Sequence, residues 1–279
     1  MNESDLRLAD GRTLHVYDTH PGDDGRLPVV WHHGTPNLGA PPAPLFEASD
    51  WLGIRWVSFD RPGYGGSTPA PGRTMSSVAG DVAAVADSLG IDRFAVVGYS
   101  GGGSYALGSA AALGDRVEAV VSLAGIAPYD ADGLDWFAGM VPSGVLALEA
   151  AVRGRAAKTA HETSGIEYDP EFTAADLAMF EGPWRWLGSV AGPAQDAGPY
   201  GHIDDDVSYV LPWGCDPISI AAPVLLVHGG EDGVIPSSHG EWLADHLPDA
   251  ELRLDPGLGH ISVLSYGEDG LEWIREQTG

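Results

Sequence analysis

The chain has 279 residues and a mass of 29.1 kDa, enough for one large α/β domain with an insertion or for two smaller domains. It carries 14 Lys and Arg residues against 40 Asp and Glu residues, a formal charge of -26, so it repels phosphate backbones and anionic lipid headgroups. The charge argues against nucleic-acid binding, and the lack of any apolar run near the roughly 18 residues that span a bilayer argues against a membrane protein.

The single cysteine, Cys215, excludes an internal disulfide and a cysteine-based metal cluster, and we interpret it as a bystander thiol. The first residues, MNESDLRLADG, lack the basic and apolar regions of a signal peptide, which predicts a cytoplasmic location. The acidity is typical of a solvated surface. Whether it reflects salt adaptation, and what the oligomeric state is, stay open.

Short apolar runs recur along the chain between segments rich in Gly, Pro and Asp. From Leu27 onward most of them are continuous instead of alternating, which is typical of strands buried on both faces of a parallel sheet. Strands that alternate with helices predict a doubly wound, mostly parallel α/β sheet flanked by helices. The predicted strands are 13–17, 27–31, 56–59, 94–97, 117–123, 224–227 and 251–254, and the predicted helices are 76–89, 102–113, 238–247 and 270–277.

The first chemical motif is His32-His33-Gly34-Thr35-Pro36, which directly follows the predicted strand 27–31. A backbone amide at the carboxyl end of a central strand is what an oxyanion hole needs, and we assign this donor to Thr35. Paired histidines also occur in metal sites, but neighbours in a strand point to opposite faces and cannot chelate one ion. We therefore expect no metal and no cofactor.

The central motif is Gly98-Tyr99-Ser100-Gly101-Gly102, which lies between a predicted strand and a predicted helix. Glycines two residues either side of the serine let strand and helix approach closely around a sharp turn. Ser100 then projects into the open. The amide of Gly101, at the start of the helix, faces a developing oxyanion.

The alternation of strands and helices stops between about Pro128 and Pro217, a segment that is too long for a loop. We expect a helical insertion that covers the sheet as a cap, with residues 1–127 and 218–279 forming the core domain and 128–217 the cap. The candidates for substrate contacts are Tyr99 and four large apolar residues of this segment, namely Trp136, Phe137, Met140 and Trp184.

An acid and a base follow at the ends of the last two predicted strands. Asp232 lies on a turn after one strand, and His260 lies on a Gly-rich loop after the other. A serine nucleophile needs a neighbouring base, and the base needs an acceptor that fixes its tautomer. Ser100, Asp232 and His260 supply these roles in that order. Glu231 and Asp130 are the alternatives for the acid.

Together these segments resemble the α/β-hydrolase fold family over nearly the whole chain. The segment Asp60-Arg-Pro-Gly-Tyr-Gly-Gly-Ser67 resembles the family's loop after its fourth strand, and we interpret it as a structural element, a tight solvated turn. The resemblance implies a carboxylic ester hydrolase that cleaves an ester, lactone or related acyl bond of a small, largely apolar molecule through an acyl-enzyme. It implies these roles: Ser100 as nucleophile, His260 as base, Asp232 as acid, and the backbone amides of Thr35 and Gly101 as the oxyanion hole.

Departures from subfamily patterns narrow the chemistry. Haloalkane dehalogenases and epoxide hydrolases share an HG-x-P element but place an aspartate where Ser100 stands, so these activities are disfavoured. Proline iminopeptidases usually show HGGPG where this chain has HGTPN, which gives a peptidase no support. Cofactor-free perhydrolases and haloperoxidases use the serine triad and are the alternative enzymes. Ligand-binding receptors on the same fold are the alternative of a different class.

The expected partner is a small acyl molecule. An apolar cap on a chain of charge -26 predicts neutral or cationic, largely apolar substrates. The cap holds few cations, and three of them cluster at Arg153, Arg155 and Lys158, while Arg185 lies between two tryptophans. One guanidinium aimed into the pocket would reverse the preference for neutral substrates.

Overall fold

The computed structural model describes all residues from 1 to 279. One eight-stranded sheet runs through it in the order β1-β2-β4-β3-β5-β6-β7-β8, with β1 antiparallel to β2, β2 antiparallel to β4, and the other neighbours parallel. The strands are β1 (Asn2–Arg7), β2 (Thr13–Asp18), β3 (Leu27–His32), β4 (Ile54–Phe59), β5 (Phe94–Tyr99), β6 (Val117–Leu123), β7 (Val224–Gly229) and β8 (Ala250–Asp255). This confirms the predicted doubly wound, mostly parallel sheet.

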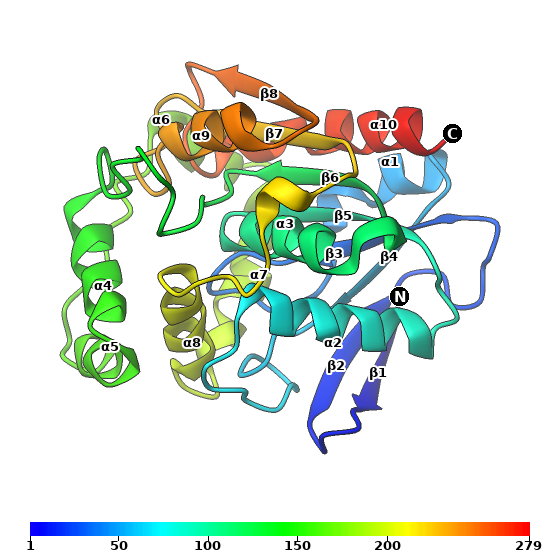
Figure 1. Ribbon diagram of the computed structural model, residues 1–279, viewed down its shortest axis with the longest axis horizontal. Helices are drawn as coiled ribbons and strands as arrows, with labels where there is room; N and C mark the ends of the chain where they lie inside the picture. The colour runs from blue at the N-terminus through cyan, green and yellow to red at the C-terminus, as the bar shows by residue number, and fades with distance from the viewer.

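Helices cover both faces of the sheet, as Figure 1 shows for α2 and α3 on one side and α1 and α10 on the other. The helices of the core are α1 (Phe46–Trp51), α2 (Met75–Ser88), α3 (Gly101–Leu113), α9 (Ser238–His246) and α10 (Gly267–Thr278). The helices between β6 and β7 are α4 (Pro142–Val152), α5 (Arg155–Glu162), α6 (Ala174–Met179), α7 (Leu187–Ala191) and α8 (Tyr200–Tyr209).

The two faces of the sheet carry separate apolar cores because successive strand residues point to opposite sides. Val96 and Val120 belong to a cluster of 34 buried residues with α2, α3 and α9. Val97 and Val121 belong to a cluster of 23 buried residues with α7 and α10. Strands buried on both faces explain the continuous apolar runs in the sequence.

Seven of the eight strands and four of the five core helices lie where the sequence predicts them, with ends that differ by a few residues. The strand that the sequence does not predict is β1, whose side chains are almost all polar and exposed because it lies at the edge of the sheet. The short helix α1 also escapes prediction, since its six residues bury only Ser49.

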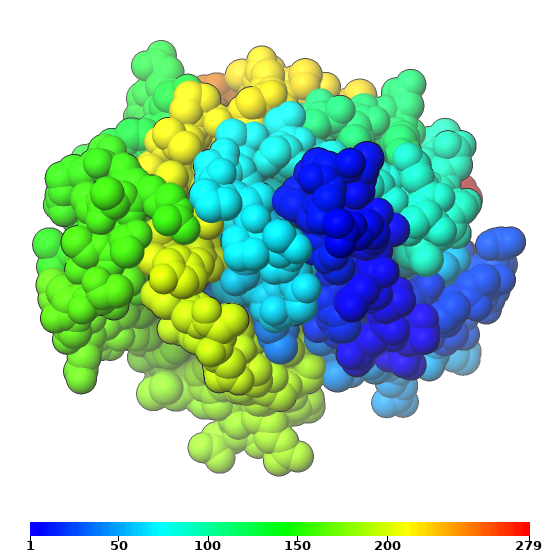
Figure 2. All heavy atoms as spheres, turned by 90° about the horizontal axis from the view of Figure 1, so that it is seen from below, coloured from blue at the N-terminus to red at the C-terminus, as the bar shows by residue number.

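The segment between β6 and β7 folds as five short helices with turns between them. α8 packs against α4 and α5 and also against α3 of the core. Figure 2 shows this segment, coloured green to yellow, over one end of the molecule and beside the cyan segment that precedes α2. No helix combines the length and the apolarity that a bilayer crossing requires.

Candidate active site

Ser100 occupies the sharp turn between β5 and α3. Its backbone has φ 57° and ψ -131°, a strained conformation for a residue with a side chain. A Cβ at Gly98 would lie 2.1 Å from the carbonyl oxygen of Gly102, and a Cβ at Gly102 would lie 2.1 Å from that of His32. The two flanking glycines are therefore required for the close contact of strand and helix.

Ser100, His260 and Asp232 form one continuous chain of hydrogen bonds. The distance from Ser100 Oγ to His260 Nε2 is 2.9 Å, and the distance from His260 Nδ1 to Asp232 Oδ2 is 2.8 Å. All three residues are buried, with exposed fractions of 8%, 5% and 5% in the order serine, histidine, aspartate. They come from the carboxyl ends of β5, β8 and β7, which meet at one edge of the sheet.

The second oxygen of the Asp232 carboxylate is held by the turn on which it lies. Asp232 Oδ1 accepts from the backbone N–H groups of Val234 at 2.8 Å and Ile235 at 2.9 Å. The two alternative acids lie differently, since Glu231 and Asp130 are both exposed and neither bonds to the histidine. The structure therefore brings Asp232, and neither alternative, to His260.

The backbone N–H groups of Thr35 and Gly101 donate no hydrogen bond within the protein. Gly101 is the first residue of α3, where unpaired N–H groups are normal. The side chain of Thr35, by contrast, is firmly held, because its Oγ1 donates to Asp205 Oδ2 at 2.7 Å and lies 2.6 Å from the hydroxyl of Tyr209.

Asp205 of α8 is the centre of a buried polar network beneath this turn. It accepts from the guanidinium groups of Arg61 and Arg73 at 2.7 and 2.6 Å. Burial alone would raise the pKa of Asp205, but the two guanidinium groups outweigh it and hold the pKa well below its ordinary value. The prediction of a solvated turn at Asp60–Ser67 is therefore wrong, because Arg61 is buried and links this segment to Asp205 of the insertion.

His32 and His33 do not form a metal site. His32 Nε2 lies 3.0 Å from Ser109 Oγ, whereas His33 Nδ1 donates to the carbonyl of Gly34 and its Nε2 accepts from the N–H of Arg61. Burial, reinforced by Arg61, lowers the pKa of His32 to about 3 and that of His33 well below its ordinary value. Both rings are neutral parts of the core.

A second group of possible metal ligands joins α5 to α8. Ligand atoms of Glu162, His202 and Asp206 lie within 4.8 Å of one another. Lys158 Nζ lies 2.6 Å from both carboxylates, so an ammonium group already supplies the positive charge that these acids require. We therefore assign this cluster to the packing of the two helices.

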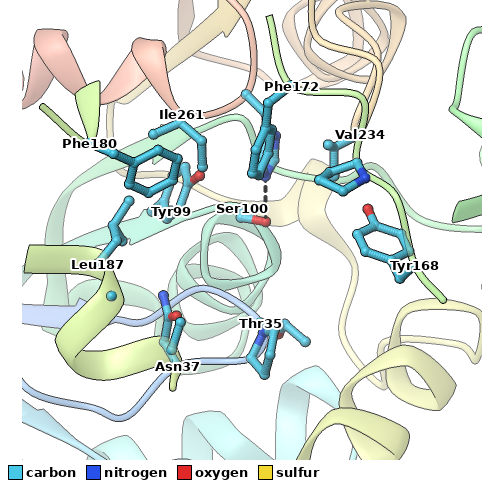
Figure 3. Close-up of a pocket in the computed structure, with 15 residues that line it drawn as sticks. Thr35, Asn37, Tyr99, Ser100, Tyr168, Phe172, Phe180, Leu187, Val234 and Ile261 are labelled. Carbon is cyan, nitrogen blue, oxygen red and sulfur yellow. Dashed lines mark hydrogen bonds between the residues drawn. The ribbon is translucent and has the colours of Figure 1, made fainter. Parts of the chain in front are cut away.

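The triad opens into a cavity of about 330 Å³ beside Ser100. Figure 3 shows Ser100 near its centre, with Asn37 and Leu187 on one side and Tyr168 and Val234 on the other. The wall is mainly apolar, and much of it comes from the segment between β6 and β7. The lining residues are Thr35, Pro36, Asn37, Tyr99, Ser100, Tyr168, Pro170, Phe172, Phe180, Leu187, Gly188, Ala191, Val234, His260 and Ile261.

Of the five predicted substrate contacts, Tyr99 lies in the cavity wall and four do not. Trp136 donates from Nε1 to the carbonyl of Ala127, and its ring packs against Phe137. Met140 joins the core on the α2 side of the sheet, and Trp184 joins the core on the other side. These side chains pack the insertion against the sheet and do not line the cavity, so the prediction that they contact the substrate is not supported.

The cations of the insertion also point away from the cavity. Arg155 Nε lies 2.5 Å from Asp204 Oδ1, and Arg153 and Arg185 are exposed. None of the three lines the cavity. Cys215 lies outside it as well, where burial raises the pKa of its thiol to about 11.

Comparison with known proteins agrees with the fold. The family model described as "alpha/beta hydrolase fold" matches residues 28–265. The chain is 29% identical to a non-heme chloroperoxidase of Streptomyces lividans, covering 94% of this chain and 95% of that one. It is 28% identical to a bifunctional esterase/perhydrolase of Acinetobacter calcoaceticus, over 95% and 97%. The solved structure of a thermophilic esterase from Thermogutta terrifontis has the same fold, with a TM-score of 0.67, 22% identity, and coverage of 99% and 97%.

Proposed function

Because the chain belongs to the alpha/beta hydrolase family and is an enzyme of the hydrolase kind, we propose that it cleaves an ester, lactone or related acyl bond through an acyl-enzyme on Ser100. The observation that carries this proposal is the hydrogen-bonded chain from Ser100 through His260 to Asp232, which opens into a cavity of about 330 Å³. A nucleophile, a base and a tautomer-fixing acid in contact are the parts that acyl transfer needs.

In the proposed first step, Ser100 Oγ bonds to the carbonyl carbon of the substrate while neutral His260 accepts the serine proton at Nε2. Asp232 holds the Nδ1–H tautomer and stabilises the imidazolium. The free N–H groups of Thr35 and Gly101 receive the oxyanion. His260 then protonates the leaving alkoxide as the C–O bond breaks. It later removes a proton from the water that attacks the acyl-enzyme and gives this proton to Ser100 Oγ as the bond between the acyl group and the serine breaks.

The lining of the cavity supports a small, neutral and mainly apolar substrate. His260 is the single residue of the lining that can carry a positive charge, and it is needed for catalysis. Each buried methylene contributes about 0.8 kcal/mol at most, so kcat/KM is expected to rise with chain length until the cavity is full. We infer that residues 128–217 act as a cap, because Tyr168, Phe172 and Leu187 of this segment line the cavity.

The test is labelling by a fluorophosphonate probe together with hydrolysis of 4-nitrophenyl esters of increasing length. Ser100→Ala is expected to abolish labelling and to lower kcat by roughly 10³- to 10⁶-fold. Asp232→Asn is expected to lower kcat by roughly 10⁴-fold. The matched controls are Ser164→Ala and Asp130→Asn, which change exposed residues outside the triad. Retention of more than a tenth of the activity by Ser100→Ala would reject the assignment.

Perhydrolysis is the second candidate, favoured by the similarity of the chain to a non-heme chloroperoxidase and to a bifunctional esterase/perhydrolase. Hydrogen peroxide would replace water in the attack on the acyl-enzyme, so that the acyl group leaves Ser100 as a peracid. Measuring peracid against free acid at increasing peroxide concentration separates the two reactions. If no ester is turned over while small molecules still raise the melting temperature, a ligand-binding role replaces both.

A further inference from the structure

The wall of the cavity holds a side-chain amide, that of Asn37, which no other protein group satisfies. Asn37 is 7% exposed and lines the cavity, yet its side-chain amide makes no hydrogen bond within the protein. Thr35 Oγ1 bonds to Asp205 and His260 bonds at both ring nitrogens, whereas the hydroxyl of Tyr99 in the same wall also has no partner. A ligand that displaces water from this amide must supply a hydrogen bond in its place or lose about 1–3 kcal/mol of binding free energy.

The backbone around Asn37 is held on its carboxyl side. The N–H of Leu38 donates to the carbonyl of Val190 at 2.9 Å, and the N–H of Gly39 donates to Asp60 Oδ1 at 2.6 Å. A Cβ at Gly34 would lie 3.1 Å from Asn37 Nδ2, so the amide is also packed closely against the backbone of the turn. The amide is thus presented to the cavity in a fixed position, which favours selective binding.

We propose that Asn37 forms a polar subsite that selects substrates carrying a neutral carbonyl or hydroxyl group a short distance from the scissile ester. This proposal rests on the proposed function and specifies its substrate class. The labelled side chains nearest Asn37 in Figure 3 are Thr35, whose hydroxyl is bonded to Asp205, and the apolar Leu187. A matching group would be a single oxo or hydroxy substituent on an otherwise apolar chain.

An anionic group does not fit this subsite. An amide can both donate and accept but carries no charge, and no arginine or lysine lines the cavity to stabilise a carboxylate. The chain as a whole carries -26, which further disfavours the approach of an anion. The chemistry therefore points to oxo- or hydroxy-esters and their lactones, and away from carboxylate-bearing esters.

The experiment compares matched ester pairs in the native protein and in Asn37→Leu, which keeps the side-chain size and removes the amide. One pair varies the acyl part (4-nitrophenyl butanoate and 3-hydroxybutanoate), and the other varies the alcohol part (butyl and 2-oxopropyl butanoate). The measured quantity is the kcat/KM of the polar ester divided by that of its apolar match, compared between the native protein and Asn37→Leu. The intrinsic reactivity of each ester is the same for both proteins and therefore cancels from this comparison. Asn2→Leu, the same substitution at an exposed edge position, is the control.

We expect Asn37→Leu to lower this ratio by about 5- to 100-fold in at least one pair, corresponding to the loss of one buried hydrogen bond. The pair that responds shows whether the subsite holds the acyl or the alcohol part. An unchanged ratio in both pairs would overturn the proposal. Calorimetric binding of the same pairs to Ser100→Ala tests the subsite without turnover, so a failure of the proposed function is distinguished from a failure of the subsite.

A different observation concerns the loop that carries His260. Asp176 of α6 is 1% exposed, and its Oδ1 accepts from the N–H groups of Ile261 at 2.8 Å and Ser262 at 2.7 Å and from Ser262 Oγ at 2.8 Å. Ser262 Oγ in turn accepts from the N–H of Gly259 at 2.8 Å. A carboxylate from the insertion thus holds the residues on both sides of the histidine.

The contact leaves little space for the loop to move. A Cβ at Gly259 would lie 2.2 Å from Asp176 Oδ2, so the backbone of the loop rests directly on the carboxylate. Burial would raise the pKa of Asp176, but the hydrogen bonds from Ser262, Thr173 and Ile261 outweigh it and lower the pKa below its ordinary value. The carboxylate is therefore charged at neutral pH, and its hydrogen bonds are of the stronger, charge-assisted kind.

We infer that Asp176 is a positioning residue that keeps His260 at the distance proton transfer from Ser100 requires. Asp176→Ala is expected to lower kcat by about 10- to 100-fold with little change in KM, because a displacement near 1 Å has an effect of this size. Asp176→Asn keeps an acceptor oxygen and is expected to restore part of the loss. Asp196→Ala, at an exposed position of the same insertion, is the control.

A purely structural role would lower the melting temperature without this effect on kcat at 25 °C. A kcat of Asp176→Ala within twofold of the native value would therefore contradict the inference. If Asp176→Ala does not fold, Ser262→Ala provides the test, because it removes the hydroxyl that links Asp176 to Gly259 and leaves the carboxylate in place. Its kcat is expected to fall by a smaller factor than that of Asp176→Ala, and an unchanged kcat would again be contrary evidence.

Discussion

β5 and β6 bury nearly every side chain among apolar neighbours, whereas α8 buries three consecutive aspartates, Asp204, Asp205 and Asp206. The sheet is held by two apolar clusters, one on each face. The insertion adds ion pairs and charge-assisted hydrogen bonds to its apolar contacts with the sheet. The comparison predicts that substitutions in the two regions destabilise the protein for different reasons. In the sheet the loss of a methylene reduces apolar packing, whereas in the insertion the loss of a charge removes an ion pair.

The largest effect is expected at the centre of the ionic contacts. Asp205→Asn leaves Arg61 without its buried counter-ion and Arg73 with only the more distant Asp204 at 3.8 Å, which costs about 3–5 kcal/mol of unfolding free energy. Urea unfolding at pH 7 measures this, with Asp196→Asn as the exposed control. A loss below about 1 kcal/mol would show that the insertion does not depend on its buried charges.

In the sheet, Leu225→Ala is expected to cost about 3 kcal/mol, because Leu225 is fully buried in β7 and its truncation leaves a cavity. No charge is involved, so the cost should be the same at pH 5 and pH 8. Urea unfolding at both pH values checks this. A cost that changed with pH would mean that the apolar core is coupled to the ionic contacts, against the comparison.

Acid should act first on two buried histidines, His228 of β7 and His239 of α9. Burial lowers the pKa of His239 and of His228 to about 4, below the ordinary value near 6.5. The folded protein then binds fewer protons than the unfolded chain, so stability is complete above pH 6.5 and is lost as the pH falls toward 4. Asp205, whose pKa is depressed from 3.8, loses its contribution only in stronger acid.

His239→Gln tests this separation. The slope of unfolding free energy against pH between 4 and 6.5 is expected to fall by up to about 1.4 kcal/mol per pH unit, the share of one histidine. Glutamine retains groups that can bond to the carbonyl of Trp136 and the N–H of Ala127, as His239 does. An unchanged slope would show that this ring is not neutral in the fold.

The smallest effect is expected for a charge at the surface. The side chain of Arg93 is 59% exposed and pairs with Glu118 at 3.0 Å. Arg93→Ala should change the unfolding free energy by less than about 1 kcal/mol, and less again at high salt, because water screens the pair. A large change in unfolding free energy for Arg93→Ala would mean that any charged residue, whether buried or exposed, stabilises the protein strongly. The burial of charge would then not distinguish the insertion from the sheet.

The same contrast separates what the sequence predicts from what it does not. Parallel strands that are buried on both faces appear in the sequence as continuous apolar runs. The turn around Ser100 requires glycines at positions 98 and 102, so both features can be recognised without a structure. Asp232 and His260 follow because they come directly after such strands. Edge strand β1 lacks the signal, since its residues face water.

The cavity wall could not be predicted from residue type. Large apolar side chains of the insertion, such as Trp136 and Trp184, proved to pack against the sheet, while Tyr168 and Phe180 line the cavity. Whether an aromatic residue packs against the sheet or lines the cavity depends on how the five short helices are connected. No periodicity in the sequence indicates these connections. The burial of Asp176 and Asp205 could not be predicted from the sequence either, because an aspartate on a short helix is usually exposed.

The place of Lys158 has a practical consequence for labelling the protein. It is the only lysine in the chain, and its side chain is fully buried between Glu162 and Asp206. Amine-reactive dyes and supports should therefore couple to the folded chain at its amino terminus alone, at neutral pH. Peptide maps of labelled protein, made before and after denaturation, would show Lys158 become reactive as α5 and α8 separate, so one side chain would report on the packing of these two helices within the insertion.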